Sequence, residues 1–151
     1  MKPFRHAIAS LAAGITPVAA FHNPTAGAVC VLAGVLPDID HILEFIVHHG
    51  RQKFSWPALF EACEQTNQLA GPLCFPRLIL VLHSSELAII LWLITAASGS
   101  VYAMAAACGY SLHMIMDMCG NPLRPRAYFL LWRLGRGFKT CELHLLSKEE
   151  P

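Results

Sequence analysis

The chain has 151 residues, which suits one domain, and we predict a single domain over residues 1–151. Its formal net charge of +1 leaves no basic stripe, so we expect no nucleic-acid partner. Hydrophobic residues make up 55% of the chain and charged residues 14%, and the mean hydropathy is +0.48. This composition is too apolar for a surface covered in charge, so it favours a membrane protein.

The six cysteines show no C-x-x-C pair and no regular spacing, so we predict free thiols rather than a disulfide framework. The N-terminus has the basic residues Lys2 and Arg5 followed by an apolar run to Phe21, as in a signal peptide. Cleavage would remove His6, and the next segment is apolar too. We therefore favour a first helix that is retained.

Apolar runs and turn residues predict a helical chain. The expected helices are 5–21, 26–36 with an extension past Pro37 to residue 47, 57–69, 77–97 and 101–118. The stretch from His48 to Pro76 is polar and irregular, and we interpret it as an excursion along a membrane surface. The segment from Leu123 to Phe138 is rich in arginine and aromatic residues, which is typical of the headgroup level of a bilayer.

Between Glu86 and His113 lie 26 residues with neither a charge nor a histidine. One membrane crossing needs roughly 20 residues, so the turn at Ser98–Ser100 favours a tight hairpin over one long span. We therefore expect an all-α polytopic membrane bundle of about four hydrophobic helices in two hairpins, with additional interfacial helices. All Lys and Arg residues fall at the end opposite the hairpin turns, which predicts a multi-pass protein of the inner membrane with that end in the cytoplasm.

A cluster of polar residues follows directly after the apolar run that ends at Pro37. It contains Asp38, Asp40 and His41. Carboxylate and imidazole groups are the ligands that divalent cations prefer, so the cluster reads as part of a metal site. The alternative is a helix end that turns polar, with Asp38 as a cap.

Two further pairs lie on the predicted second hairpin. His83 and Glu86 are three residues apart, and His113 and Asp117 are four apart, so each pair shares a helix face. The first pair precedes Gly99 by 16 and 13 residues, and the second follows it by 14 and 18. At about 1.5 Å per residue, all four side chains lie at one level of the hairpin.

The first predicted hairpin repeats this spacing about its own turn at Asn23. His6 precedes the turn by about 17 residues, while Asp38, Asp40 and His41 follow it by about 14 to 18. Potential ligands from both hairpins therefore gather at one end of the bundle. Ionisable residues within membrane helices are costly and usually functional, which favours a metal site there.

A simpler alternative is that His6, Glu86 and Asp117 only reach water at the membrane surface. The remaining histidines lie away from the shared level, and we expect them to be solvated or interfacial. They are His22, His48, His49 and His144.

The order of these blocks resembles the YdjM-like family of membrane-bound metal-dependent hydrolases. That family has an early His, an L-P-D-x-D-H block, an H-S segment and a late H-x-x-x-D. The matching residues are His6, Leu36–His41, His83–Glu86 and His113–Asp117, followed by Asn121-Pro122, Tyr128–Leu130 and Arg133. The family is related to zinc-dependent phospholipases C and single-strand nucleases, so the resemblance implies a phospholipase C-like metal site. The chain departs at Pro76-Arg77-Leu78, where many members have H-R-G.

The leading hypothesis is a hydrolase in which two or three divalent ions activate water toward a phosphoester. Zinc is the expected metal, with manganese or magnesium as alternatives. The expected metal ligands are His6, Asp38, Asp40, His83, Glu86, His113 and Asp117. Asp40, His41 and Glu86 are the expected catalytic residues, as ligands, partners of ligands or a general base. Membrane lipid is the expected partner and a candidate substrate. Arg124, Arg126 and Arg133 are candidate phosphate-binding groups, and the alternative is that they only anchor the protein to anionic lipid. The sequence identifies no protein partner.

Two other functions compete with hydrolysis. The same ligands could hold a divalent cation on a transport path, but the helix halves near both turns are almost wholly apolar, which counts against a path. A haem held by two histidines needs apolar surroundings, whereas carboxylates lie beside nearly every histidine of the cluster.

Overall fold

The computed structural model describes the backbone of residues 3–145 and the side chains of residues 8–20 and 22–145. Within this part of the chain the regular elements are helices. Strand pairing there is limited to two isolated antiparallel bridges, Arg77 with Lys139 and Leu123 with His144. The helical part of the fold prediction is therefore confirmed.

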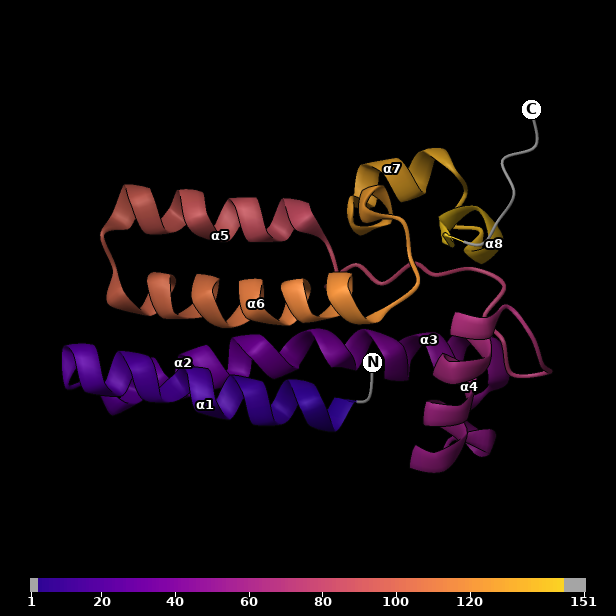
Figure 1. Ribbon diagram of the computed structural model, residues 1–151, viewed down its shortest axis with the longest axis horizontal. Helices are drawn as coiled ribbons and strands as arrows, with labels where there is room; N and C mark the ends of the chain where they lie inside the picture. The colour runs from indigo at the N-terminus through magenta and orange to yellow at the C-terminus, as the bar shows by residue number, and fades with distance from the viewer. Residues whose placement is uncertain (1–2, 146–151) are drawn as a thin grey trace.

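The α-helices are α1 (Pro3–Phe21), α2 (Pro24–Val35), α3 (Ile39–His49), α4 (Trp56–Gln68), α5 (Ser85–Ser98), α6 (Val101–Gly120), α7 (Leu130–Gly135) and α8 (Thr140–Leu143). Helices α1, α2, α5 and α6 lie side by side, and α4, α7 and α8 lie at one end of this stack (Figure 1). Short 3₁₀ turns occupy Leu36–Asp38, Arg51–Lys53 and Pro125–Tyr128. Helix α2 contacts α1 on one side and α6 on the other, and α6 also contacts α5. The stack thus consists of two helical hairpins, α1–α2 and α5–α6.

Polar caps begin several of these helices. Asn23 accepts a hydrogen bond from the backbone N–H of Ala26 at 3.0 Å, and Pro24 fills the first turn of α2, where no N–H partner is needed. The same capping role belongs to Ser55, Ser84 and Ser100. Gly99 ends α5 in the left-handed conformation, with a φ of 61°. The hairpin turn predicted around Gly99 is confirmed.

Two glycines allow the backbone of α2 to approach its neighbours closely. A Cβ atom at Gly109 would collide with the backbone carbonyl of Cys30 on α2. At Gly34 it would collide with the side chain of Ser10 on α1. Because backbone atoms cannot move aside as a flexible side chain can, the α2–α6 contact depends on hydrogen at Gly109.

One hydrophobic core lies between the stacked helices and includes Ala26, Cys30 and Ala105. A second hydrophobic core lies where α3, α4 and the C-terminal segment meet. Its buried members are Phe45, Leu59, Ala62, Phe75, Leu78, Leu80, Ala127 and Leu143. They come from segments far apart in the sequence, including the loop between α4 and α5. This core fixes that loop against the end of the helical stack.

No helix within residues 3–145 is long and apolar enough to cross a membrane. The predicted polytopic membrane bundle is therefore wrong, and so are the multi-pass location in the inner membrane and the cytoplasmic orientation derived from it. The prediction began the third long helix near Arg77, but α5 begins at Ser85 and has 14 residues. Helix α2 ends at Val35 after 12 residues, because the chain tightens into a 3₁₀ turn at Pro37. At 1.5 Å per residue both helices are shorter than the roughly 30 Å of a hydrocarbon core.

Smaller predictions have mixed outcomes. All six cysteines are free thiols, as predicted. His144 was expected to be solvated, but it is fully buried and its Nε2 atom lies 2.7 Å from the carbonyl oxygen of Asn67. His22 is exposed, whereas His48 and His49 are half-buried.

The close contact at Gly109 generates a prediction for stability. Gly109→Ala places a methyl group against the Cys30 carbonyl, so we expect it to cost about 1–3 kcal/mol of the free energy of unfolding. Thermal unfolding followed by circular dichroism measures this. The matched control is Gly135→Ala in α7, where an added Cβ meets no atom within 4 Å and the change should stay within about 0.5 kcal/mol. Equal effects of the two substitutions would contradict the packing argument.

Candidate metal centre

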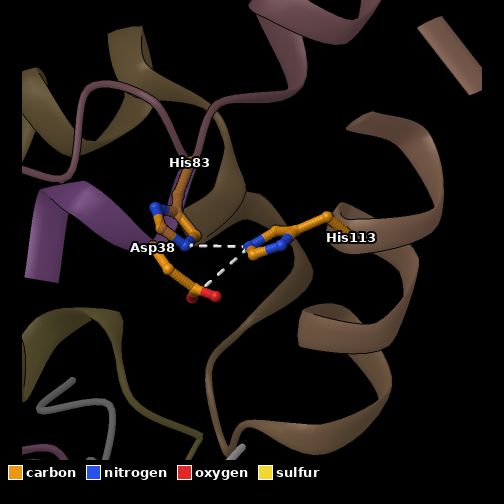
Figure 2. Close-up of side chains that lie close together, drawn as sticks. All are labelled: Asp38, His83 and His113. Atoms are coloured by element: carbon orange, nitrogen blue, oxygen red, sulfur yellow. Dashed lines mark hydrogen bonds and ion pairs between the residues drawn. The ribbon is translucent and has the colours of Figure 1, made fainter. Parts of the chain in front are cut away.

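Three segments bring a carboxylate and two imidazoles together (Figure 2). Asp38 lies in the 3₁₀ turn between α2 and α3, His83 in the loop before α5, and His113 on α6. One possible ligand atom from each side chain lies within 4.8 Å of the others. Asp38 makes no capping hydrogen bond to α3, which disfavours the capping alternative. The group of Asp38, His83 and His113 could hold a metal ion.

Asp117 adds a further carboxylate to this group. It follows His113 by one helical turn, and its Oδ2 atom lies 3.3 Å from the Nε2 atoms of both His83 and His113. The side-chain amide of Asn121 donates a hydrogen bond to the other oxygen of Asp117 at 2.9 Å. Asp117 is therefore held with one oxygen toward the two imidazoles.

The second ring nitrogen of each histidine faces an acceptor. His113 Nδ1 lies 2.8 Å from the backbone carbonyl oxygen of Gly34, so Nδ1 carries the proton and donates it. His83 Nδ1 lies 3.5 Å from Oδ2 of Asp40, which is an ion-pair distance without a hydrogen bond. These contacts leave the Nε2 atoms, which are 3.1 Å apart, as the ligand atoms of both rings. An imidazole that ligates a metal through one nitrogen and faces an acceptor with the other is a common arrangement in metal sites.

The site residues fit a divalent cation. His83, His113 and Asp117 are almost fully buried. Two neutral Nε2 lone pairs at this separation repel each other unless a proton or a cation lies between them. Burial lowers the pKa of His113, but Asp117 and Asp38 raise it more, so the pKa lies above its usual value. The carboxylates of Asp117 and Asp38 thus favour a positive charge next to the Nε2 atoms of the two histidines.

Asp40 and His41, two expected catalytic residues, lie at the edge of the group. The Asp40 carboxylate accepts a hydrogen bond from the backbone N–H of Leu82, next to His83. The ring of His41 lies 4.8 Å from that of His83, and its buried Nδ1 atom has no hydrogen-bond partner among the described residues. Burial, and then His83, lower the pKa of His41 to about 3. The imidazole of His41 is therefore neutral at physiological pH.

Glu86, another predicted ligand, is not brought into the group. Both oxygens of Glu86 accept backbone hydrogen bonds, from the N–H groups of Leu130 at 2.9 Å and Leu131 at 3.0 Å. Glu86 therefore stabilises the start of α7, and its contacts give it a structural role. The side chain of His6 lies outside the described residues.

Sequence reasoning missed the residues that hold the loop of His83. Arg133 is buried and donates hydrogen bonds from its guanidinium to the carbonyl oxygens of Ile79 at 2.8 Å, Leu80 at 3.0 Å and His83 at 2.8 Å. The hydroxyl of Tyr110 on α6 lies 2.7 Å from the carbonyl oxygen of Leu82. Arg133 was a candidate phosphate-binding group, but its guanidinium binds backbone carbonyls instead. Sequence alone does not reveal which carbonyls an arginine will contact.

A cavity of about 400 Å³ adjoins the metal-binding group. Asp38, His41, His83 and Asp117 form part of its wall, and Arg133 also contributes. A cavity of this size is in the range of small-molecule sites. The candidate metal-binding residues therefore lie next to a cavity that is large enough for a small molecule.

Comparison of the chain with protein-family models, with curated proteins and with solved structures finds no match. The resemblance to the YdjM-like hydrolases therefore stays a prediction, and the geometry of the site is the basis for proposing a function.

Metal binding tests the group directly. Because His113 contributes Nε2 at the centre of the group, we expect His113→Ala to weaken binding of Zn²⁺ or Co²⁺ by more than about 100-fold, beyond the usual effect of losing an outer partner. Equilibrium dialysis with metal analysis measures the affinity. His22→Ala is the matched control, because His22 is exposed. Equal affinity of the two variants would exclude this group as the metal site.

Asn121 should act indirectly, because its amide orients Asp117. We expect Asn121→Ala to reduce metal affinity by about 10- to 100-fold, the usual effect of losing an outer partner. The same dialysis measurement applies, with circular dichroism to verify the fold. Unchanged affinity would show that Asp117 needs no such support.

Proposed function

We propose that the protein is a metal-dependent hydrolase that cleaves a phosphoester. The observation that carries this proposal is the convergence of Asp38, His83, His113 and Asp117, three of which (Asp38, His83 and Asp117) line a cavity. A purely structural metal site is closed by protein ligands and needs no adjoining space, whereas a catalytic site keeps a position for water and substrate. The cavity supports the catalytic alternative.

Each residue has a defined part in this proposal. His83 and His113 would bind the cation through Nε2. One of Asp38 and Asp117 would complete the ligand set through a carboxylate oxygen, and the other would accept a hydrogen bond from water at the position left open. Asp40 holds the loop of His83. His41 lines the cavity as a neutral imidazole, and its low pKa makes it a hydrogen-bond partner for water or substrate rather than a general base. The cation supplies Lewis acidity, which makes water more acidic and stabilises negative charge on the phosphoryl oxygens.

Zinc is the proposed metal, because mixed imidazole and carboxylate ligands suit it, and manganese is the alternative. The described side chains contain one group of at least three candidate ligands with this proximity. We therefore propose one ion at this group. A second or third ion would need ligands beyond it, among which His6 remains a candidate.

Turnover of phosphoesters tests the proposal. We expect purified protein with Zn²⁺ or Mn²⁺ to release product from a panel of phosphomonoesters and phosphodiesters, to lose activity with a chelator and to regain it with metal. Asp117→Asn should lower kcat by about 10- to 100-fold, since it removes the carboxylate that lies 3.3 Å from both imidazoles of the metal-binding group. His22→Ala should keep full activity.

The contradicting result is also defined. Tight metal binding at Asp38, His83 and His113 without turnover of any substrate would show a cation-binding protein rather than a hydrolase. Loss of the folded state on chelation, measured by circular dichroism, would then indicate a structural metal.

A further inference from the structure

The cavity has two chemically different walls. The polar wall carries the metal-binding group. The opposite walls are apolar and come from α3, α4, the loop between α4 and α5, and the C-terminal segment. Their apolar members include Ile42, Leu59, Phe60, Phe75, Leu78 and Leu143. Several of these belong to the second hydrophobic core, so the cavity extends into that core.

Two polar side chains in these walls, Thr66 and Tyr128, are already engaged with the protein. Thr66 donates a hydrogen bond to the carbonyl of Ala62 at 2.7 Å and accepts one from the N–H of Phe75 at 2.8 Å. Tyr128 donates its hydroxyl proton to the backbone carbonyl of Asp117 at 2.8 Å. Burial raises the pKa of the Cys63 thiol to about 11, so this side chain is neutral. A sugar or a nucleobase would lose its hydrogen bonds to water here and regain few of them.

We propose that the cavity holds a single apolar chain of the substrate, and that the substrate is a phosphoester of a long-chain alcohol with its phosphate at the metal-binding group. This inference rests on the proposed function and names its substrate class. Charge and shape agree with it, since the phosphate meets the cation and the imidazoles while the chain meets Leu59, Phe75 and Leu143. The chain is either a straight alkyl or a branched isoprenyl group.

The size of the cavity sets the expected chain length. A methylene group is close in size to a water molecule, about 30 Å³ in the liquid, so the cavity takes roughly ten carbons. Burying each methylene contributes about 0.8 kcal/mol, which corresponds to roughly fourfold in affinity. Affinity should therefore rise steeply along a chain series and level off once the cavity is filled.

The first experiment measures binding without turnover. Ethyl, butyl, hexyl, octyl and decyl phosphate, each below its micelle concentration, are titrated calorimetrically into the Zn²⁺-loaded protein. We expect roughly fourfold tighter binding per methylene up to the limit. Decyl phosphate that binds no tighter than ethyl phosphate would overturn the inference, whatever the protein hydrolyses.

The second experiment measures kcat/KM on the same series and on the matching 4-nitrophenyl diesters. Activity that rises with chain length supports both proposals. Activity that ignores chain length overturns the inference and leaves the proposed function intact. Chain-dependent binding without any turnover overturns the proposed function, and with it the assignment of the bound compound as substrate. Geranyl phosphate compared with decyl phosphate distinguishes an isoprenyl from an alkyl chain.

A variant with a partly filled cavity tests whether the alkyl chain binds there. Cys63→Phe adds a ring to the cavity wall, so the affinity series should level off at a shorter chain while ethyl phosphate binds as before. Cys141→Phe makes the same change at an exposed cysteine and should leave the series unaltered. Thermal unfolding of both variants verifies folding. Should Cys63→Phe fail to fold, Phe60→Trp at the partly exposed cavity wall provides the second narrowing variant. An unaltered series in a folded narrowing variant would overturn the inference.

Discussion

The hydrogen bond between His113 and the carbonyl of Gly34 is the contact on which the site depends. It joins α6 to the end of α2, and it requires the two backbones to be close. Gly34 and Gly109 provide that closeness, because a side chain at either position would collide with the neighbouring helix. The same hydrogen bond assigns the Nδ1 proton of His113 and leaves Nε2 toward His83 and Asp117. The close packing of α2 against α6 therefore also determines which nitrogen of His113 is available to a metal ion.

The sequence predicted much of this arrangement because local signals were strong. Pro37 ends an apolar run, so Asp38, Asp40 and His41 were expected at a break between two helices, and the structure has a 3₁₀ turn there. The four-residue spacing of His113 and Asp117 needs only helical geometry, and both side chains face His83. The Ser98–Ser100 turn was equally clear. These features depend on neighbouring residues and could be predicted without knowledge of the fold.

The predictions that failed depend on contacts between distant segments. The apolar residues from Leu78 to Leu82 resemble the start of a helix, but Arg133 and Tyr110 bind carbonyls of this segment, which forms a loop that ends in a turn. That loop shortens α5 and removes the length on which the membrane prediction rested. It also separates His83 from Glu86, which caps α7 instead. No pattern within residues 77–97 reveals a partner 50 residues farther along the chain.

The position of Arg133 also bears on the order of assembly during synthesis. His83 is translated long before the arginine that holds its backbone, and the two are 50 residues apart. Because closing a long loop costs conformational entropy before its contacts form, local helices such as α1 and α2 fold early and this contact forms late. A ribosome-bound chain that ends before residue 133 would carry all of its histidine and aspartate ligands without the loop geometry that brings them together. Formation of this candidate metal-binding group is thus coupled to synthesis of the segment that contains Arg133.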